Sequence, residues 1–500
     1  MKKIGIINVG ASAFRMYITE YDPNGDEHGL DYLVKPLRLG TDTFTQGYIS
    51  LENVKRATDI LNMFRLKLEE YNITEYKAMC TSGVREATNR EFFLDYTMLH
   101  SDIKLEILDP SEEIYIKYLG AKHTVEDFKL LEKEGLVFAN VSSGNVMLNI
   151  SRKDLTVYAG SLPYGSLRLR QMFRSISHLK RHKAIEEHVR VMISRIISTI
   201  DPKIKLRHLL GSGSSINLML RLFNETVISL NRLKEVYELV RTMSLIEIEQ
   251  ETGLRKDEAS VLVPTLITYI NLLDIVGSKS FTFSNLSFPH TMALYYSGQI
   301  KDRQVDSRIG RTLISIAEKY RANTRHAKWV LKFATKMFNE LDDLHSLGQD
   351  SLNILEAAVI LNDVGYYVAD DNLAGNSLYI IKSLKIPGAD PNLLRLAASV
   401  VYEGNRVAGQ RDPQEYAYLS PVEVLNIRKL AAILRLAKAL DYSHNRHIYE
   451  LEIAIADHVI IYAHAEKEPY LEMYAFDQQK QLFIETFGVS IDLRARVNYD

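Results

Sequence analysis

Cysteine is almost absent from this chain: Cys80 is the one cysteine in 500 residues, so an intrachain disulfide is excluded. A single thiol is typical of a reducing compartment, and Cys80 is expected to be a small buried strand residue. An excess of one charge is also lacking, because the net charge is -2. We therefore expect a cytoplasmic protein without DNA or membrane as partner, in which any polyanion site is a local patch.

Long hydrophobic runs are missing as well. The most apolar stretch, residues 261–276, contains proline, asparagine and aspartate and is shorter than the roughly 20 residues that span a bilayer. The apolar run at the N-terminus is broken by Asn8 and Gly10, which predicts a first β-strand and not a signal peptide. The length predicts about three domains.

Three β-rich runs each lead into a turn of small residues, at 8–12, 140–145 and 211–215. Small residues let successive backbone N–H groups approach an anion. One such turn is weak support, since any tight turn uses Gly and Ser, but three predict a duplicated phosphate-binding fold with a cleft between two lobes. The expected phosphate-binding residues are Gly10, Ser12, Ser142, Ser143, Gly144, Gly211 and Gly213.

Helix and strand patterns alternate up to about residue 300, which indicates α/β layers. Ser50 is expected to cap a helix with apolar residues at 54, 57, 61, 64 and 68. Residues 305–446 are predicted to be helical, and β-type runs return at 459–462 and 481–484. We predict lobes at 1–124 and 125–302 and a third domain at 303–500, whose β-containing part begins at about 448.

Motifs along nearly the whole chain resemble one family. They lie at 8–15, at 81–89 (Thr-Ser-Gly-Val-Arg-Glu-Ala-Thr-Asn), at 111–120, at 162–169 and at 255–264, with His326 and residues 357–365 beyond them. The chain resembles the Ppx/GppA phosphatases, which hydrolyse inorganic polyphosphate or guanosine pentaphosphate. This resemblance implies two actin-like (ribonuclease H-like, ASKHA) lobes followed by a mainly helical HD-type domain.

The resemblance also implies a site: Mg²⁺ on oxygen ligands, Glu113 as catalytic base and Arg85 as a phosphate contact. Glu112 stands beside the base, in the family's metal-site region. Read without the family, the two glutamates are equally a first-turn pair favoured by the helix dipole, and Arg85 an arginine that ties the lobes together.

The family's other acidic residues are replaced in this chain. Asn8 and Asn140 stand where the family has aspartates, and Met147 stands where it has a glutamate. An amide oxygen carries no charge and a thioether is a poor Mg²⁺ ligand, which argues against the metal here.

The metal site of the HD-type domain is altered in the same way. His326 and Asp363 remain, while Asn362 and Lys438 replace the other ligands. We predict a metal-free helical scaffold, in which the histidine-rich residues 441–447 form a loop.

A basic patch consists of Arg168, Arg170, Arg174, Lys180, Arg181 and Lys183. It is read either as a channel for a long polyanion or as a solvated helix face. The favoured hypothesis is a protein that binds polyphosphate or a guanosine polyphosphate in the cleft, with hydrolysis weakened or lost. The alternatives are an active exopolyphosphatase with Glu113 as base and a non-catalytic nucleotide-sensing regulator. The oligomeric state is open, a homodimer included.

Overall fold

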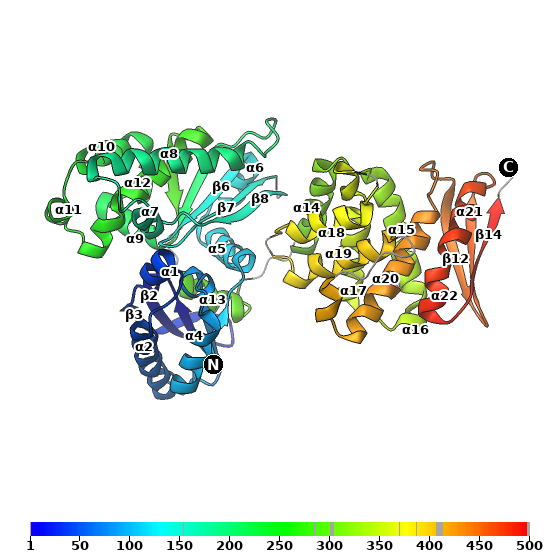
Figure 1. The fold of residues 1–500 in the computed structure, drawn as a ribbon, viewed down its shortest axis with the longest axis horizontal. Coiled ribbons are helices and arrows are strands. Elements are labelled where there is room, and N and C mark those ends of the chain that lie inside the picture. The colour runs from blue at the N-terminus through cyan, green and yellow to red at the C-terminus, as the bar shows by residue number, and fades with distance from the viewer. Residues whose placement is uncertain are drawn as a thin grey trace. The chain divides into compact units, whose positions relative to one another are not determined.

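The computed structural model describes residues 2–153, 155–284, 287–300, 305–369, 371–386, 388–406 and 414–497. The chain divides into two compact units, Met1–Gln304 and Val305–Asp500 (Figure 1). The predicted boundary between residues 302 and 303 lies close to this division. Each unit is described by itself.

The first lobe of the first unit is built on one sheet. Its strands are β1 (Lys2–Val9), β2 (Ala13–Tyr21), β3 (Glu27–Pro36), β4 (Tyr76–Cys80) and β5 (Glu106–Ile107), in the order β3-β2-β1-β4-β5. Its helices are α1 (Leu39–Gln46), α2 (Leu51–Glu70), α3 (Ser82–Arg85), α4 (Arg90–Ser101) and α5 (Pro110–Thr124). The predicted cap of α2 is confirmed, because Ser50 accepts a hydrogen bond from the Asn53 amide and the predicted apolar face is buried.

The second lobe repeats this plan. Its strands are β6 (Leu136–Val141), β7 (Val146–Arg152), β8 (Leu155–Leu162), β9 (His208–Ser212), β10 (Val227–Ser229) and β11 (Ser280–Phe283), in the order β10-β11-β9-β6-β7-β8. Its helices are α6 (Phe128–Glu134), α7 (Ser166–Met172), α8 (His178–Ile197), α9 (Ser214–Phe223), α10 (Leu230–Val240), α11 (Leu245–Thr252) and α12 (Lys256–Val276). In each lobe three antiparallel strands are followed by two strands parallel to the first, which confirms the predicted duplication. The second lobe adds the short β10 at the edge, antiparallel to β11.

Two helices join the lobes. α5 follows β5 of the first sheet and packs on β6, β7 and β8 of the second. α13 (Phe288–Tyr296) follows the second sheet in sequence but packs on β1, β2 and α5, so the chain returns to the first lobe within the range predicted for the second. Within the described residues, α12 is the one helix with the length and composition of a membrane span, and 72% of its apolar window is buried, as in a core helix.

The second unit is helical with a small sheet, as predicted. Its helices are α14 (Val305–Lys319), α15 (Thr324–Glu340), α16 (Asp342–His345), α17 (Gln349–Leu361), η1 (Val364–Tyr367), α18 (Leu373–Ser383), α19 (Pro391–Asn405), η2 (Gln414–Tyr418), α20 (Pro421–Ala439), α21 (Tyr470–Gln479) and α22 (Gln481–Phe487). Its strands are β12 (Ile448–Ile455), β13 (Val459–Ala465) and β14 (Ile491–Val497), in that order in the sheet.

One strand prediction is wrong. Residues 481–484 were expected to be β-type, but they form the first turn of α22. Phe483 is buried in the core, and Gly488 ends the helix in the left-handed conformation with a φ of 69°. A short run with three apolar residues does not distinguish a strand from a buried helical turn, so the surrounding packing decides.

Candidate functional site

A pocket in the first unit collects the predicted turns from both lobes. Its lining includes six of the expected phosphate-binding residues, Gly10, Ser12, Ser142, Ser143, Gly144 and Gly213. Gly211 is the exception, because it lies within β9, where an added Cβ would meet Phe281 and Ile216. Gly211 therefore permits packing inside the lobe and does not face the pocket.

The two lobes touch directly at this pocket. Ser12 Oγ donates to Ser143 Oγ at 2.5 Å. A Cβ on Gly144 would lie 2.2 Å from Ser82 Oγ, so only glycine permits this approach. Gly213 has a φ of 104°, in the left-handed region that favours glycine. The turns thus present small residues to one another across a narrow space.

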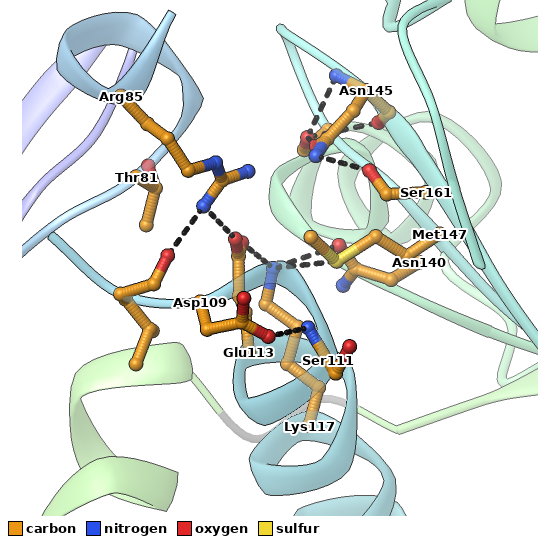
Figure 2. Close-up of polar contacts among 12 residues, drawn as sticks. Thr81, Arg85, Asp109, Ser111, Glu113, Lys117, Asn140, Asn145, Met147 and Ser161 are labelled. Atoms are coloured by element: carbon orange, nitrogen blue, oxygen red, sulfur yellow. Dashed lines mark hydrogen bonds and ion pairs between the residues drawn. The ribbon is translucent and has the colours of Figure 1, made fainter. Parts of the chain in front are cut away.

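Glu113 lines the pocket from the start of α5. The helix begins at Asp109, whose carboxylate accepts from the Ser111 amide at 2.7 Å. The Glu113 side chain is 3% exposed; its Oε1 accepts from Lys117 Nζ at 2.6 Å and its Oε2 from Arg85 Nη1 at 3.0 Å (Figure 2). Burial raises the pKa of Glu113, but the charges of Lys117 and Arg85 outweigh it and hold the pKa below its usual value. Both carboxylate oxygens are therefore engaged by cations.

Arg85 stands behind Glu113 and is outside the pocket lining. Besides its bond to Glu113, its Nη1 donates to the Leu108 carbonyl at 2.8 Å. Glu112 is outside the pocket lining as well. It accepts a hydrogen bond from the Tyr296 hydroxyl at 3.1 Å, and burial raises the pKa of Glu112. Of the Arg85, Glu112 and Glu113 set, only Glu113 reaches the pocket.

Lys117 is a pocket residue that sequence reasoning missed. Its Nζ donates to Glu113 Oε1 at 2.6 Å and to Asn140 Oδ1 at 3.0 Å, and it lies 3.9 Å from Met147 Sδ. The Phe288 ring centroid is 4.6 Å from the same nitrogen. The available signal was spacing, because residues four apart on a helix share a face and Lys117 follows Glu113 by one turn.

These residues do not fit the Mg²⁺ that the resemblance implies. Mg²⁺ binds oxygen at ~2.0–2.1 Å, but Glu113 Oε1 and Asn140 Oδ1 both accept from the Lys117 ammonium. Met147 contributes a thioether to this cluster. Asn8 is 4% exposed, and its Nδ2 donor has no hydrogen-bond partner within the described part of the chain. No group of three or more His, Cys, Asp or Glu side chains in that part is placed to hold a metal ion.

The basic patch does not form one continuous channel. Arg168 bridges the lobes: its Nε donates to the Gly144 carbonyl at 2.8 Å and its Nη2 to Glu86 Oε2 at 2.5 Å. Arg170 and Arg181 line a second pocket within the second lobe. Burial and the charges of Arg38 and Arg181 lower the pKa of Arg170. The exposed members of the patch are Arg174, Lys180 and Lys183.

In the second unit, the residues expected at a metal site bond to one another. Lys438 Nζ donates to Asn405 Oδ1 at 2.7 Å, and Asn405 Nδ2 donates to Asn362 Oδ1 at 2.9 Å. Burial lowers the pKa of Lys438, and the charge of Asp363 opposes this shift. Asn405 thus links Lys438 to Asn362, the two residues that replace expected ligands.

His326 has a partner that the sequence analysis did not identify. Its Nδ1 lies 2.8 Å from Asp441 Oδ2, and its ring stacks on His444 with centroids 3.9 Å apart. Residues 441–447 form the predicted loop between α20 and β12. This loop ties the end of α20 to the start of α15.

The first unit has the architecture of the actin-like proteins: two lobes of one topology with a pocket between them. The sequence model of the Ppx/GppA phosphatase family matches residues 30–294, and that of Ppx/GppA phosphatase, domain III, matches residues 309–480. The chain belongs to the Ppx/GppA phosphatase family.

Named relatives agree with this membership. A guanosine-5'-triphosphate,3'-diphosphate pyrophosphatase of Photobacterium profundum is 23% identical over 453 residues, or 88% of this chain and 86% of the relative. The crystal structure of an exopolyphosphatase from Cytophaga hutchinsonii is 22% identical with a TM-score of 0.52, covering 60% of this chain and 99% of that one. An Aquifex aeolicus family member is 16% identical with a TM-score of 0.50 and the same coverages. The solved structures establish the fold alone.

Proposed function

We propose that this chain binds inorganic polyphosphate or a guanosine polyphosphate between the two lobes, and that its phosphoanhydride hydrolysis is weakened or lost. The observation that carries the proposal is the lining: serines and glycines from both lobes surround one carboxylate, Glu113, which two cations already hold. Hydroxyls and backbone N–H groups suit a polyanion, whereas hydrolysis of this type uses carboxylates to hold a metal. The similarity to a guanosine polyphosphate pyrophosphatase supports the ligand class.

The test is phosphate release from polyphosphate and from guanosine pentaphosphate, with Mg²⁺ and with Mn²⁺, beside an active family exopolyphosphatase. We expect turnover lower by ~10²-fold or more, because a Glu113 carboxylate held by two cations is not free to act as a general base, whose usual contribution is ~10²–10⁴-fold. Calorimetry on the same preparation measures binding. Comparable turnover by both proteins would refute the loss of hydrolysis, and absent binding would refute the ligand site.

Glu113 in the pocket lining supports a second candidate, an active exopolyphosphatase with this residue as base. In that enzyme the ligand has to displace Lys117 or Arg85 to free a carboxylate oxygen. Glu113→Gln then abolishes the remaining turnover. For the second unit we propose an HD-type helical scaffold without metal, in which the pair of His326 and Asp441 is structural.

A further inference from the structure

Lys117 is held in place from several directions. Its side chain is 9% exposed, and its contacts come from α5 itself, from Asn140 on β6, from Met147 on β7 and from Phe288 on α13. A lysine on a flexible stem normally samples many positions, but here a buried carboxylate and an amide oxygen fix the ammonium (Figure 2). The Phe288 ring lies against the same nitrogen. The pocket therefore contains a positive charge at a defined point.

This charge and a divalent cation exclude one another. A metal at bonding distance from Glu113 and Asn140 would take the two oxygens that accept from Lys117. It would also lie within a few Å of the ammonium, where like charges repel strongly in a buried site. Arg85 on the second oxygen of Glu113 adds to this repulsion. The protein's own cation occupies the place that a metal would need.

Among its described residues, the remaining lining offers hydrogen-bond donors and no carboxylate besides Glu113. Among the described residues of the lining, the charged ones are Arg15, Lys117 and Glu113. Asn8 faces the same pocket with a buried Nδ2 that lacks a partner in the described part of the chain. Buried donors are almost always satisfied, so this amide indicates a missing acceptor. An anionic oxygen fits both the unpaired donor and the excess of positive charge.

We propose that Lys117 replaces the divalent cation of this cleft, so that the end of a phosphoanhydride chain is bound by Lys117, Asn8 and Arg15 without metal. The inference rests on the proposed function and specifies its ligand contacts. Glu113 is then a positioning residue that holds Lys117 and Arg85. The shared ligand chemistry is a terminal phosphate, whether of inorganic polyphosphate or of a nucleotide.

The first experiment is calorimetry with inorganic tripolyphosphate and, separately, with guanosine tetraphosphate, in EDTA and in Mg²⁺. Wild type should bind at least one of them in EDTA as tightly as in Mg²⁺. Lys117→Met should weaken this binding by about tenfold or more, the usual effect of losing a charge-assisted hydrogen bond. The control is Lys55→Met, which removes the same charge from the exposed face of α2 and should bind like wild type.

The outcomes separate the two proposals. Binding only in Mg²⁺ overturns the role of Lys117 and leaves the proposed function standing. No binding in either buffer overturns both. Because Lys117→Met could unfold the lobe, Asn8→Ala provides a second variant: it removes a donor without a described partner, so it should keep the fold and still lower affinity severalfold. Unchanged affinity in folded Lys117→Met contradicts the proposal.

A metal readout provides an independent test. Electron paramagnetic resonance of added Mn²⁺ should detect no bound ion in wild type or in Asn140→Asp, because Lys117 pairs with the new carboxylate. Asn140→Asp combined with Lys117→Met should bind Mn²⁺, since the carboxylates are then free of the ammonium. Stoichiometric Mn²⁺ in wild type that is lost in Asn140→Ala would overturn the replacement.

Discussion

The two units each place a lysine among polar side chains, with opposite consequences. In the first unit Lys117 meets the Glu113 carboxylate at 2.6 Å and lines a pocket. In the second unit Lys438 donates to the Asn405 amide oxygen at 2.7 Å, and no carboxylate of the described chain stands within ion-pair distance of it. Burial lowers the pKa of Lys438, so its charged form is disfavoured there.

The difference shows that a buried lysine alone does not make an anion site. A carboxylate beside Lys117 stabilises the charge of a lysine that lines a pocket. Within the described residues, the charge of Lys438 is compensated by the Asn405 amide oxygen and by the charge of Asp363. Lys117 is therefore suited to binding an anionic ligand, and Lys438 to a structural role within the second unit.

The largest expected effect is a loss of stability of the first unit in Glu113→Gln, because Glu113 holds two buried cations in position. Glu113→Gln leaves Lys117 and Arg85 without their counter-ion, and breaking a buried pair costs about 3–5 kcal/mol. The first unit should lose this much stability in urea, measured by the reactivity of the single thiol, Cys80, which is buried in β4.

The single tryptophan, Trp329, reports on the second unit, where no change is expected. The matched control is Glu112→Gln, which removes the same charge beside Tyr296 and should cost much less. Equal losses in the two variants would show that Glu113 has no special structural role.

A second prediction concerns the different pH ranges in which the two units change stability, the first unit in acid and the second in alkali. The pKa of Glu113 is lowered, so its stabilising contribution is complete above the usual value of 4.5 and is lost as pH falls through the folded value. The pKa of Lys438 is also lowered, so the cost of burying its charge is complete below the folded pKa and falls as pH rises above it. As pH rises toward the usual 10.5, the unfolded chain alone keeps the proton and the second unit gains stability.

Urea unfolding over a pH series, followed through Cys80 and Trp329, measures both slopes. Lys438→Met should remove the alkaline gain in the second unit and leave the acid loss in the first. Parallel profiles for the two probes would contradict the distinction between the lysines.

A third prediction concerns how long polyphosphate chains bind outside the cleft. Arg170 and Arg181 lie close together with like charges, so a long polyanion that leaves the cleft is expected to be attracted to them. Arg170→Gln with Arg181→Gln should weaken binding of long polyphosphate severalfold at low salt and leave tripolyphosphate unaffected. Lys183→Gln, on the exposed side of α8, is the control. Equal effects on long and short chains would argue against an extended site.

The smallest expected effect concerns the metal content of the second unit, which Asp363→Ala should not change. Asn362 and Lys438 replace two of the expected metal ligands, so elemental analysis of the purified chain should find no stoichiometric transition metal bound there. Asp363→Ala should leave the metal content unchanged. About one metal per chain, lost in that variant, would place a working site in this unit.

Local pattern predicted much of the fold. The cap at Ser50, the strand–turn segments and the change to helices after residue 305 all appear in the structure, because each depends on neighbours in sequence. The prediction failed at 481–484, where a short apolar run fits two periods. Gly211 was predicted to face a ligand, but packing against Phe281 explains this glycine.

The sequence by itself determined the family, the two-lobed fold and the replacement of acids by Asn8, Asn140 and Met147. Only the tertiary structure decided what fills their place. Lys117 was readable as one helical turn from Glu113, but Asn140 and Met147 reach it from strands of the other lobe. The strength of an electrostatic interaction depends on the distance between the groups and on their burial. The order of residues in the sequence gives neither quantity directly.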